Sequence, residues 1–539
     1  MIKQHKLPER SLIRLIAKSA QRNPEATALI HGSETISYAN LQTRIHRLAA
    51  NLTKLGITKG DRVGIWLPNV PEWIESLFAC AYVGAISVSV NTRYRKSEVT
   101  DILSRSGCKA LVFSSNYKTI QFSSILHEIR EDLQQELEIL IVVGQINEEI
   151  KNTTNVQIFP YESLLENVTP VQPMGAGSSS CIMFTTSGTT NLPKLVVHNQ
   201  ATVSLHSKNV ATALDLDRPN ATVLQAIPFC GVFGFSQAIA ALSSGASVLC
   251  VPSFDIKATL KLIQNHQVTH LNGSDEMFDR LVKYSQNPAA FRSVTFCGYA
   301  NFTPSLTDIV EKADKLGLKL VGLYGASELL AFLATQKSNA TPSKRVRMGG
   351  FPVNKNTNVR VRNPKTGKLL GQGSVGELEF KCISLMEGYY KDPEATKSAI
   401  TIDGFFRSGD LGKLCKDGSF EFLSRMGDVL RLGGFLVNPQ EIETFIQGHP
   451  AVLGCQVVGI DGPGKPSCVA FIIIEDTLNI SEDEIILFCQ DNLAKYKVPS
   501  HIFFIEKFPT TTGPNGTKIQ RSVLRDLAES KILSQNHEI

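Results

Sequence analysis

Features that would mark a membrane or secreted protein are absent from the 539-residue chain. No run of 18 apolar residues occurs, and the nearest approach, residues 77–90, is interrupted by Gly84 and by serines, so no transmembrane segment is predicted. The N-terminus has scattered charges and lacks the apolar core and cleavage site of a secretory signal. We therefore expect a soluble, cytoplasmic protein and leave peripheral membrane contact open.

Charge and cysteine usage exclude two further classes. The formal net charge is only +5, and no block of five or more basic residues occurs, which argues against nucleic acid as a partner. The eleven cysteines form no C-x-x-C pair and no metal-like cluster with histidines. Their odd number favours reduced, mostly buried thiols over disulfides.

Apolar residues, at 42% of the chain, are sufficient for more than one core. Between residues 35 and 143 helical and strand periods alternate: Leu41, Ile45 and Leu48 share one helical face, and residues 63–67 have the pattern of a buried strand. The alternation returns at 223–334. It predicts an α/β fold with parallel sheets and crossover helices.

The pattern changes from about residue 346 onward. Short strands separated by Gly, Asn and Asp turns predict an antiparallel part resembling a small β-barrel. After residue 426 a further compact unit begins, with roughly 110 residues, enough for its own core. We therefore predict a large domain at 1–426 and a small α+β domain at 427–539, with Gly427 as the hinge.

Residues 186–194, with the sequence Thr-Ser-Gly-Thr-Thr-Asn-Leu-Pro-Lys, place four hydroxyls, a glycine and a lysine after an apolar run. Hydroxyls and N–H groups freed by a glycine turn can donate to several phosphate oxygens, and a lysine adds a mobile charge. The stretch is not a Walker A loop, because Pro193 and Leu195 flank Lys194. Alone, such a stretch is more often a solvated loop, so its meaning depends on the motifs further along the chain.

Further polar motifs lie in predicted loops at strand ends, where binding groups are usually found. They are Tyr324-Gly325-Ala326-Ser327-Glu328, Gly376-Glu377-Leu378, Gly388-Tyr389-Tyr390, Ser408-Gly409-Asp410, Arg425 with Asp428, Pro439 to Glu443, and Asn515 to Arg521. In this order and spacing they resemble the adenylate-forming (AMP-binding) superfamily, and most of all its acyl-CoA synthetase branch, over nearly the whole chain. The resemblance implies a large α/β domain with a barrel-like part, followed by a small mobile domain.

The resemblance also implies a two-step ligase reaction. A carboxylic acid joins the α-phosphate of ATP and releases pyrophosphate, and the thiol of coenzyme A then displaces AMP. Because the first step brings an anion against a polyanion, positive groups and Mg²⁺ must offset the repulsion. By resemblance, the β- and γ-phosphates are bound by Thr186, Ser187, Gly188, Thr189, Thr190 and Lys194, and Mg²⁺ by Glu328 with Thr189.

Other residues are assigned by the same resemblance to the nucleoside, the acid and the chemical step. Asp410 accepts hydrogen bonds from the ribose hydroxyls, with help from Arg425. Lys518, on the small domain, reaches between the carboxylate and the α-phosphate and leaves when that domain rotates. Tyr324 stacks on the adenine, the segment Gly298, Tyr299 and Ala300 lies along the base, and Gly325 and Ser327 also bind the nucleotide. The acyl pocket is formed by Gly231, Phe233, Gly298 and Tyr299. The catalytic residues are Lys518, Lys194 and Glu328.

Five positions depart from the family pattern. Asn191 and Leu195 stand where glycines are usual, and Gly427 stands at the hinge where Asp or Lys is usual. In the acyl pocket Gly231 replaces a histidine or an aromatic residue, and Tyr299 replaces Gly or Ala. We therefore expect Tyr299 to limit the acyl tunnel and to favour a short, medium or cyclic acid.

Three functions fit these features, and we favour the first: an acyl-CoA synthetase acting on a fatty or related acid. The second is a stand-alone adenylating enzyme that loads the phosphopantetheine of a separate carrier protein, because no carrier domain fits after Lys518. The third is a catalytically impaired nucleotide-binding scaffold, against which the retained Lys194, Glu328 and Asp410 argue. The acid itself and a homo-oligomeric state are left open.

Overall fold

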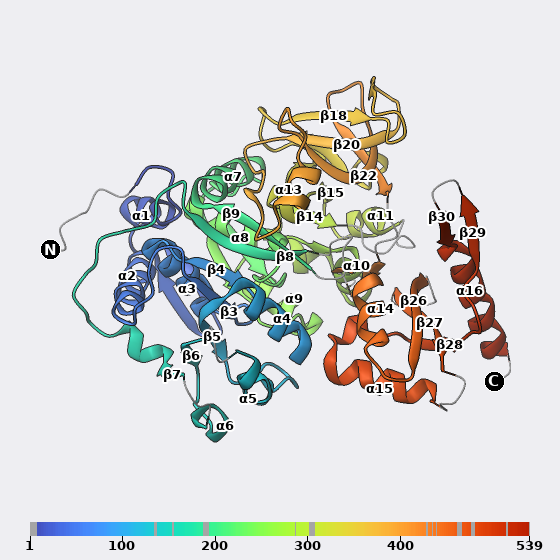
Figure 1. Cartoon of the computed structure of the whole chain (residues 1–539). Coiled ribbons are helices and arrows are strands. Elements are labelled where there is room, and N and C mark those ends of the chain that lie inside the picture. The colour runs from blue at the N-terminus through green and yellow to red at the C-terminus, as the bar shows by residue number, and fades with distance from the viewer. Residues whose placement is uncertain are drawn as a thin grey trace. The chain divides into compact units, whose positions relative to one another are not determined.

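The computed structural model describes residues 8–133, 137–152, 156–186, 193–285, 287–300, 308–426, 430–433, 435–437, 439–460, 466–475, 480–513 and 516–537. These residues form two compact units (Figure 1). The first is built from the described residues of 1–92, 100–185 and 195–426, and the second from those of 93–99, 186–194 and 427–539.

An eight-stranded, mostly parallel sheet in the first unit has the strand order β21-β9-β8-β4-β3-β5-β6-β7. Central β3 is buried and runs parallel to β4 and β5, as the apolar run at 63–67 predicts. Gly64 packs closely there: a Cβ atom would lie 2.7 Å from Leu111 Cδ1 of the next strand, and that side chain would have to shift. The strands are β3 (Arg62–Trp66), β4 (Ile86–Ser89), β5 (Cys108–Ser114), β6 (Ile139–Val143), β7 (Gln157–Pro160), β8 (Ser180–Thr186), β9 (Lys194–Asn199) and β21 (Gly388–Tyr389).

Helices connect these strands and bury the faces that the sequence predicts. Leu41, Ile45 and Leu48 are buried on α2, and Ser37 caps that helix by accepting from the Asn40 N–H at 3.2 Å. Pro71 begins α3, and Gly84 ends it in a left-handed conformation at φ 83°. The helices are α2 (Tyr38–Lys54), α3 (Pro71–Val83), α4 (Lys96–Ser106), α5 (Phe122–Leu133) and α6 (Glu148–Lys151), and the 3₁₀ turn η1 (Tyr161–Leu165) follows β7.

A second sheet in this unit has five strands in the order β12-β10-β11-β1-β2. The N-terminal hairpin joins it through parallel pairing of β1 with β11. The long helices α7 and α8 pack side by side (Figure 1). The elements are α1 (Ile13–Arg22), β1 (Thr27–His31), β2 (Glu34–Ser37), α7 (Gln200–Ala213), β10 (Thr222–Gln225), α8 (Val232–Ser244), β11 (Ser247–Cys250), α9 (Ile256–Asn265) and β12 (His270–Leu271).

The third sheet changes from parallel to antiparallel along its length, in the order β13-β14-β15-β16-β17-β23-β22-β20-β18-β19. The antiparallel strands predicted after residue 346 thus continue the parallel pair β14–β15 by way of β16 and β17. Its strands are β13 (Gly273–Ser274), β14 (Cys297–Ala300), β15 (Leu320–Tyr324), β16 (Ala334–Thr335), β17 (Gly349–Pro352), β18 (Asn358–Arg362), β19 (Leu369–Leu370), β20 (Gly376–Lys381), β22 (Phe406–Leu414) and β23 (Phe420–Arg425). Its helices are α10 (Asp275–Tyr284), α11 (Ile309–Asp314), α12 (Pro342–Arg345) and α13 (Pro393–Ala399), with the 3₁₀ turns η2 (Pro288–Phe291) and η3 (Ser327–Leu329).

The second unit has its own core around the three-stranded sheet β26-β27-β28. Arg521, at the start of α16, binds the buried Glu443 carboxylate at 2.8 Å and donates to the Val457 carbonyl at 2.8 Å. Its elements are β24 (Leu430–Leu432), β25 (Phe435–Val437), α14 (Pro439–Gln447), β26 (Val452–Ile460), β27 (Ser467–Ile474), α15 (Glu482–Asn492), η4 (Lys495–Lys497), β28 (His501–Phe504), β29 (Thr510–Gly513), β30 (Gly516–Ile519) and α16 (Arg521–His537).

Two whole-chain properties complete the description. The helices within the described ranges include none that combines the length and the apolar character needed to span a bilayer. All eleven cysteines are free thiols, and eight of them are buried.

Candidate active site

The Ser/Thr-rich stretch that the sequence assigns to phosphates lies between two strands. Thr186 ends β8 and Lys194 begins β9, whereas Ser187, Gly188, Thr189, Thr190 and Asn191 lie outside the described residues. The unusual Leu195 is buried in β9 with an exposed fraction of 3%, and its carbonyl accepts from the Tyr390 N–H at 2.8 Å. Leu195, one of the departures from the family pattern, is thus a buried residue of the strand.

Glu328, the predicted magnesium ligand, lies in the short turn η3 that follows β15. The side chain is buried, and its Oε1 accepts a hydrogen bond from the Tyr389 hydroxyl at 2.9 Å. The Glu328 carbonyl accepts from the Met386 N–H at 2.8 Å. The motif Gly388-Tyr389-Tyr390 thus meets the motif Tyr324 to Glu328, and the tyrosine orients one carboxylate oxygen.

Asp410, predicted to bind ribose, contacts Tyr324, predicted to bind adenine. The Tyr324 hydroxyl donates to Asp410 Oδ2 at 2.6 Å, and both side chains are buried. The Tyr324 ring packs against the rings of Phe380, Phe420 and Phe422, with centroids 5.2, 5.2 and 5.8 Å away. An aromatic cluster therefore fixes the phenol, and the phenol in turn orients the carboxylate.

A bulge in β22 presents Asp410. The Ser408 hydroxyl donates to the Leu378 carbonyl at 2.6 Å and accepts from the Asp410 N–H at 3.1 Å. Gly409 has φ 68°, and its N–H donates to Glu377 Oε1 at 3.2 Å. Burial raises the pKa of the Glu377 carboxyl above its usual value. The motif Gly376-Glu377-Leu378 therefore positions the motif that carries Asp410.

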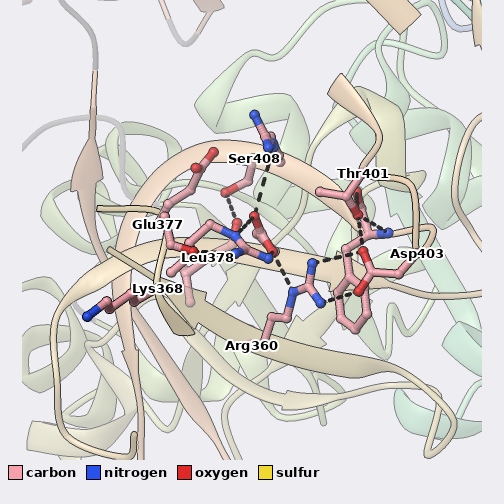
Figure 2. A network of polar contacts seen from close by, with 12 residues as sticks. Arg360, Lys368, Glu377, Leu378, Thr401, Asp403 and Ser408 are labelled. Carbon is pink, nitrogen blue, oxygen red and sulfur yellow. Dashed lines mark hydrogen bonds and ion pairs between the residues drawn. The ribbon is translucent and has the colours of Figure 1, made fainter. Parts of the chain in front are cut away.

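The strand beside this bulge is held by an ion cluster around Glu379. Figure 2 shows one part of it, the contact of Arg360 with Asp403. The fully buried Glu379 carboxylate accepts from Arg360 Nε at 2.5 Å and from Arg362 Nε at 2.7 Å. Arg360 also donates to both oxygens of Asp403, at 2.5 and 3.1 Å, and its guanidinium lies 3.7 Å from the centroid of the Phe405 ring. Two guanidinium groups compensate the buried charge, which makes the cluster a rigid support for β20.

Arg425, predicted to assist at the ribose, lies in β23 directly opposite Asp410 in the antiparallel register. Its side chain lies outside what the structure describes. The backbone alone thus places the two predicted partners side by side, although Arg425 comes fifteen positions after Asp410 along the chain.

The segment Gly298 to Ala300 forms β14, and its first two residues differ in their surroundings. A Cβ atom on Gly298 would lie 2.7 Å from both Asn272 Oδ1 and Leu323 Cδ1, so a larger residue would require these two side chains to shift. Tyr299 is fully buried in a hydrophobic core, and its hydroxyl donates to the Val346 carbonyl at 3.0 Å. The role of Tyr299 as a limit of the acyl pocket stays a prediction, and the observed surroundings are those of a core residue.

The other wall predicted for the acyl pocket lies at the start of α8. Gly231 is the residue before this helix, and Phe233 lies in its first turn. The Phe233 ring packs against that of Phe332, with centroids 4.9 Å apart. Phe332 comes four residues after Glu328, so one loop contributes both a predicted metal ligand and a contact to the predicted acyl wall.

Lys518 belongs to the β29–β30 hairpin of the second unit and lies opposite Thr511. Its side chain is outside the described part of the structure, as is Gly427, the residue predicted to be the hinge. The anchoring of Arg521 to Glu443 fixes the start of the helix after the hairpin. The motif at 515–521 thus meets the motif at 439–443, as their shared membership in the small domain predicts.

Several residues of this site are not found by sequence motifs. Donors from α7, α8 and β9 reach the loop around Glu328: they are His198, His206 and Ser236. In the sequence these residues are visible only as polar side chains among the apolar residues of buried segments. That pattern does not reveal which groups they bind. Only the tertiary structure shows which carbonyl groups they bind.

Comparisons with known proteins find similar proteins over nearly the whole chain. YngI of Bacillus subtilis (strain 168) is 29% identical over 536 residues, which cover 95% of this chain and 96% of that protein. The mitochondrial medium-chain acyl-CoA ligase ACSF2 of Bos taurus is 28% identical over 551 residues, covering 98% and 89%. A solved structure, a double mutant of o-succinylbenzoate CoA synthetase (MenE) from Bacillus subtilis, has a TM-score of 0.81 at 22% identity and covers 95% of this chain and 98% of that one.

The similarity to the solved structure of o-succinylbenzoate CoA synthetase confirms the predicted α/β fold with a large N-terminal and a small C-terminal domain. The family model for the AMP-binding enzyme matches residues 16–390, and the model for the AMP-binding enzyme C-terminal domain matches residues 441–513. The first match alone covers more than half of the chain. Tyr389 and Tyr324 donate to the buried carboxylates of Glu328 and Asp410. The chain that carries these pairs is a member of the AMP-binding enzyme family.

Proposed function

We propose that the chain is an ATP-dependent carboxylic acid–CoA ligase that forms an acyl adenylate and then a CoA thioester. One observation carries this proposal most directly: the loop Tyr324 to Glu328 supplies a buried carboxylate at one end and, through Tyr324, orients the buried Asp410 at the other. An acceptor-only carboxylate suits ribose hydroxyls, and a second suits a cation bound to phosphates. Relatives named as acyl-CoA ligases support the same reaction.

In the first step, a carboxylate oxygen of the acid attacks the α-phosphorus and the bond to pyrophosphate breaks. Lys194 and the hydroxyls at 186–190 stabilise the charge on the departing pyrophosphate. Lys518, delivered by the small domain at 427–539, places its ammonium between the carboxylate and the α-phosphate. In the second step the thiol sulfur of coenzyme A attacks the acyl carbon, and AMP leaves.

Magnesium is the metal that we propose for the first step. Glu328 fits it, because its carboxylate is a hard oxygen ligand and Mg²⁺ is usually held by one or two carboxylates together with phosphates and water. Thr189 is proposed as its helper. When bound, the metal offsets the negative charge of the phosphates, while Tyr389 keeps Glu328 oriented.

The substrate that we propose is a fatty or related acid of short or medium length, or a cyclic acid. The relative named medium-chain acyl-CoA ligase supports this class, and the bulk of Tyr299 is its support within the chain. The Tyr299→Gly change should extend the accepted chain length, measured as kcat/KM for a series of straight-chain acids. The Tyr299→Phe variant, which keeps the ring and loses the bond to Val346, is the matched control. An unchanged profile in Tyr299→Gly would rule out this role.

A change at Lys518 gives the sharpest test of the proposal that this lysine acts in the first half-reaction and not in the second. The Lys518→Ala change should lower acid-dependent ATP–pyrophosphate exchange by orders of magnitude, about 10²-fold or more, since a positioned charge at the reacting phosphate is lost. Thiolation of a preformed acyl adenylate should continue. Unimpaired exchange would contradict the assignment.

One assay also separates the alternative functions. Pyrophosphate exchange is measured with a panel of acids, and AMP release is then measured with and without coenzyme A. Exchange that leads to turnover only with a phosphopantetheine carrier protein would favour the carrier-loading enzyme. The absence of exchange with every acid would favour a nucleotide-binding scaffold.

A reducing compartment such as the cytoplasm is the location that we propose, because all eleven cysteines are free thiols.

A further inference from the structure

Three consecutive non-glycine residues directly after Leu329 adopt a left-handed backbone. Leu330, Ala331 and Phe332 have φ values of 60°, 49° and 41°. A residue with a side chain costs about 1–2 kcal/mol in this conformation, because its Cβ crowds the following carbonyl. Such runs persist only where the surrounding structure forces them, and they concentrate at functional sites. The left-handed turn Leu330–Phe332 begins two residues after Glu328.

Two buried side chains from neighbouring helices hold this turn. His206 Nε2 on α7 donates to the carbonyls of Leu330 and Ala331, at 3.1 and 3.0 Å. The Ser236 hydroxyl on α8 donates to the Leu330 carbonyl at 2.5 Å. The donors are 2% exposed, and water therefore has little access to replace them. Successive carbonyls of the left-handed turn are thus satisfied by side chains and not by a regular ladder.

The loop is held equally firmly on the side that precedes Glu328. His198 Nε2 donates to the Ser327 carbonyl at 2.8 Å. The Ala331 N–H donates back to the Ala326 carbonyl at 3.0 Å. A Cβ atom on Gly325 would lie 2.5 Å from Ala331 Cα, so the two arms of the loop touch. Glu328 therefore lies in a closed loop that is fixed on both sides.

Both histidines act as neutral donors at neutral pH. Burial lowers the pKa of His198 and of His206 to about 4. Since each Nε2 faces a carbonyl, that nitrogen carries the proton in the neutral ring. Their effect on the loop is thus one of hydrogen-bond geometry and not of charge.

We infer that His206, together with Ser236, is a positioning residue for Glu328: it holds the left-handed turn that fixes where the carboxylate meets the metal–nucleotide complex. This inference rests on the proposed function of Glu328. Neither His206 nor Ser236 is among the residues that the sequence motifs assign. Supporting groups of this kind typically change metal affinity or activity about 10- to 100-fold when they are lost, and misplacement by about 1 Å can cost 10²-fold in rate.

The test compares His206→Ala and His206→Asn with a control at another buried histidine. His270 is equally buried and donates to the Leu214 carbonyl at 2.7 Å, away from the loop, so His270→Asn is the control. Titration calorimetry with ATP and Mg²⁺ in the absence of acid should give a dissociation constant about tenfold or more higher for His206→Ala. His206→Asn, which keeps a donor, should recover most of the affinity, and His270→Asn should bind like wild type.

Kinetics separate positioning from general damage. His206→Ala should raise the Mg²⁺ concentration at half-maximal pyrophosphate exchange and the KM for ATP, with little change in the KM for the acid. Thiolation of a preformed acyl adenylate, which needs no metal–pyrophosphate contact, should change less than about threefold. Equal losses in both half-reactions, or equal affinity for MgATP in wild type and His206→Ala, would overturn the inference.

If His206→Ala does not fold, Ser236→Ala tests the inference instead, because it removes one hydroxyl that donates to the turn. MgATP affinity at least about threefold weaker supports the positioning role, and unchanged affinity overturns it. Failure of the proposed function has a different signature, because wild-type protein would then show no exchange with any acid.

Discussion

Glu328 and Asp410 are both buried carboxylates that accept from a tyrosine hydroxyl, but the backbones that carry them are stabilised differently. Asp410 follows a bulge in which Gly409 takes the positive φ at little conformational cost, and the neighbouring strand supplies the hydrogen bonds. Glu328 precedes three left-handed residues with side chains, which distant helices hold in place. The backbone at Asp410, the proposed ribose acceptor, thus depends on local sheet structure, whereas the backbone at Glu328, the proposed metal ligand, depends on long-range packing.

The largest effect is expected from the carboxylates themselves. Glu328→Gln and Asp410→Asn keep the shape of each side chain and remove its charge. Each should lower pyrophosphate exchange by about 10²- to 10³-fold, as the loss of an oriented polar group in an active site commonly does. Excess Mg²⁺ should partly restore Glu328→Gln and leave Asp410→Asn unchanged, measured over a magnesium titration. The same response in both variants would remove the distinction between the two regions.

Removing only the tyrosine hydroxyls should have the next largest effect. Each hydroxyl donates to a carboxylate, and such a bond contributes about 1.5–3 kcal/mol, which corresponds to roughly 10- to 100-fold in affinity. Tyr389→Phe should weaken MgATP binding through Glu328. Tyr324→Phe should instead reduce the preference for ATP over 2′-deoxy-ATP, since Asp410 is the proposed ribose acceptor. Competition between the two nucleotides measures this, and an unaltered preference would count against the ribose assignment.

Exchanging glycine and alanine between the two loops tests the backbone argument directly. Gly409→Ala places a side chain at φ 68° and should lower the free energy of unfolding by about 1–2 kcal/mol. Ala331→Gly relieves a left-handed alanine at φ 49° and should change that free energy by less than about 1 kcal/mol. Chemical denaturation measures both. Ala331→Gly should also restore part of the MgATP affinity lost in His206→Ala, and a further loss in the double variant would contradict a strained turn.

The last prediction is a pH dependence of stability that arises from His206, which holds the turn after Glu328. The pKa of His206 is about 4 in the folded protein, below the usual 6.5, so the unfolded chain binds more protons between these values. Its contribution to stability is therefore fully present above pH 6.5 and is lost as the pH falls toward 4. Wild type should lose about 1.4 kcal/mol per pH unit more than His206→Asn across this window, measured by denaturation at several pH values. The difference between the variants cancels other titrating groups, such as Glu75, whose pKa is raised to about 7 by burial.

Much of the fold could be predicted from the sequence because periodicity reports burial directly. The strand at 63–67 and the helix carrying Leu41, Ile45 and Leu48 lie where their patterns predict. The motifs likewise named Glu328, Tyr324 and Asp410, because few other roles need those residue types in that order. The antiparallel strands were predicted as well, but their continuity with β14 and β15 was not, since strand pairing across long connections leaves no local pattern.

The sequence by itself determined the family and the sheet-and-helix layout, and it named the carboxylates and lysines that we propose for the reaction. Each of these depends on residue type and spacing along one segment. Only the tertiary structure decided how Glu328 is held, because His206 and Ser236 lie far from it in the chain and use backbone carbonyls as partners. A carbonyl group is present in every residue, so a sequence cannot tell which one a buried donor will bind.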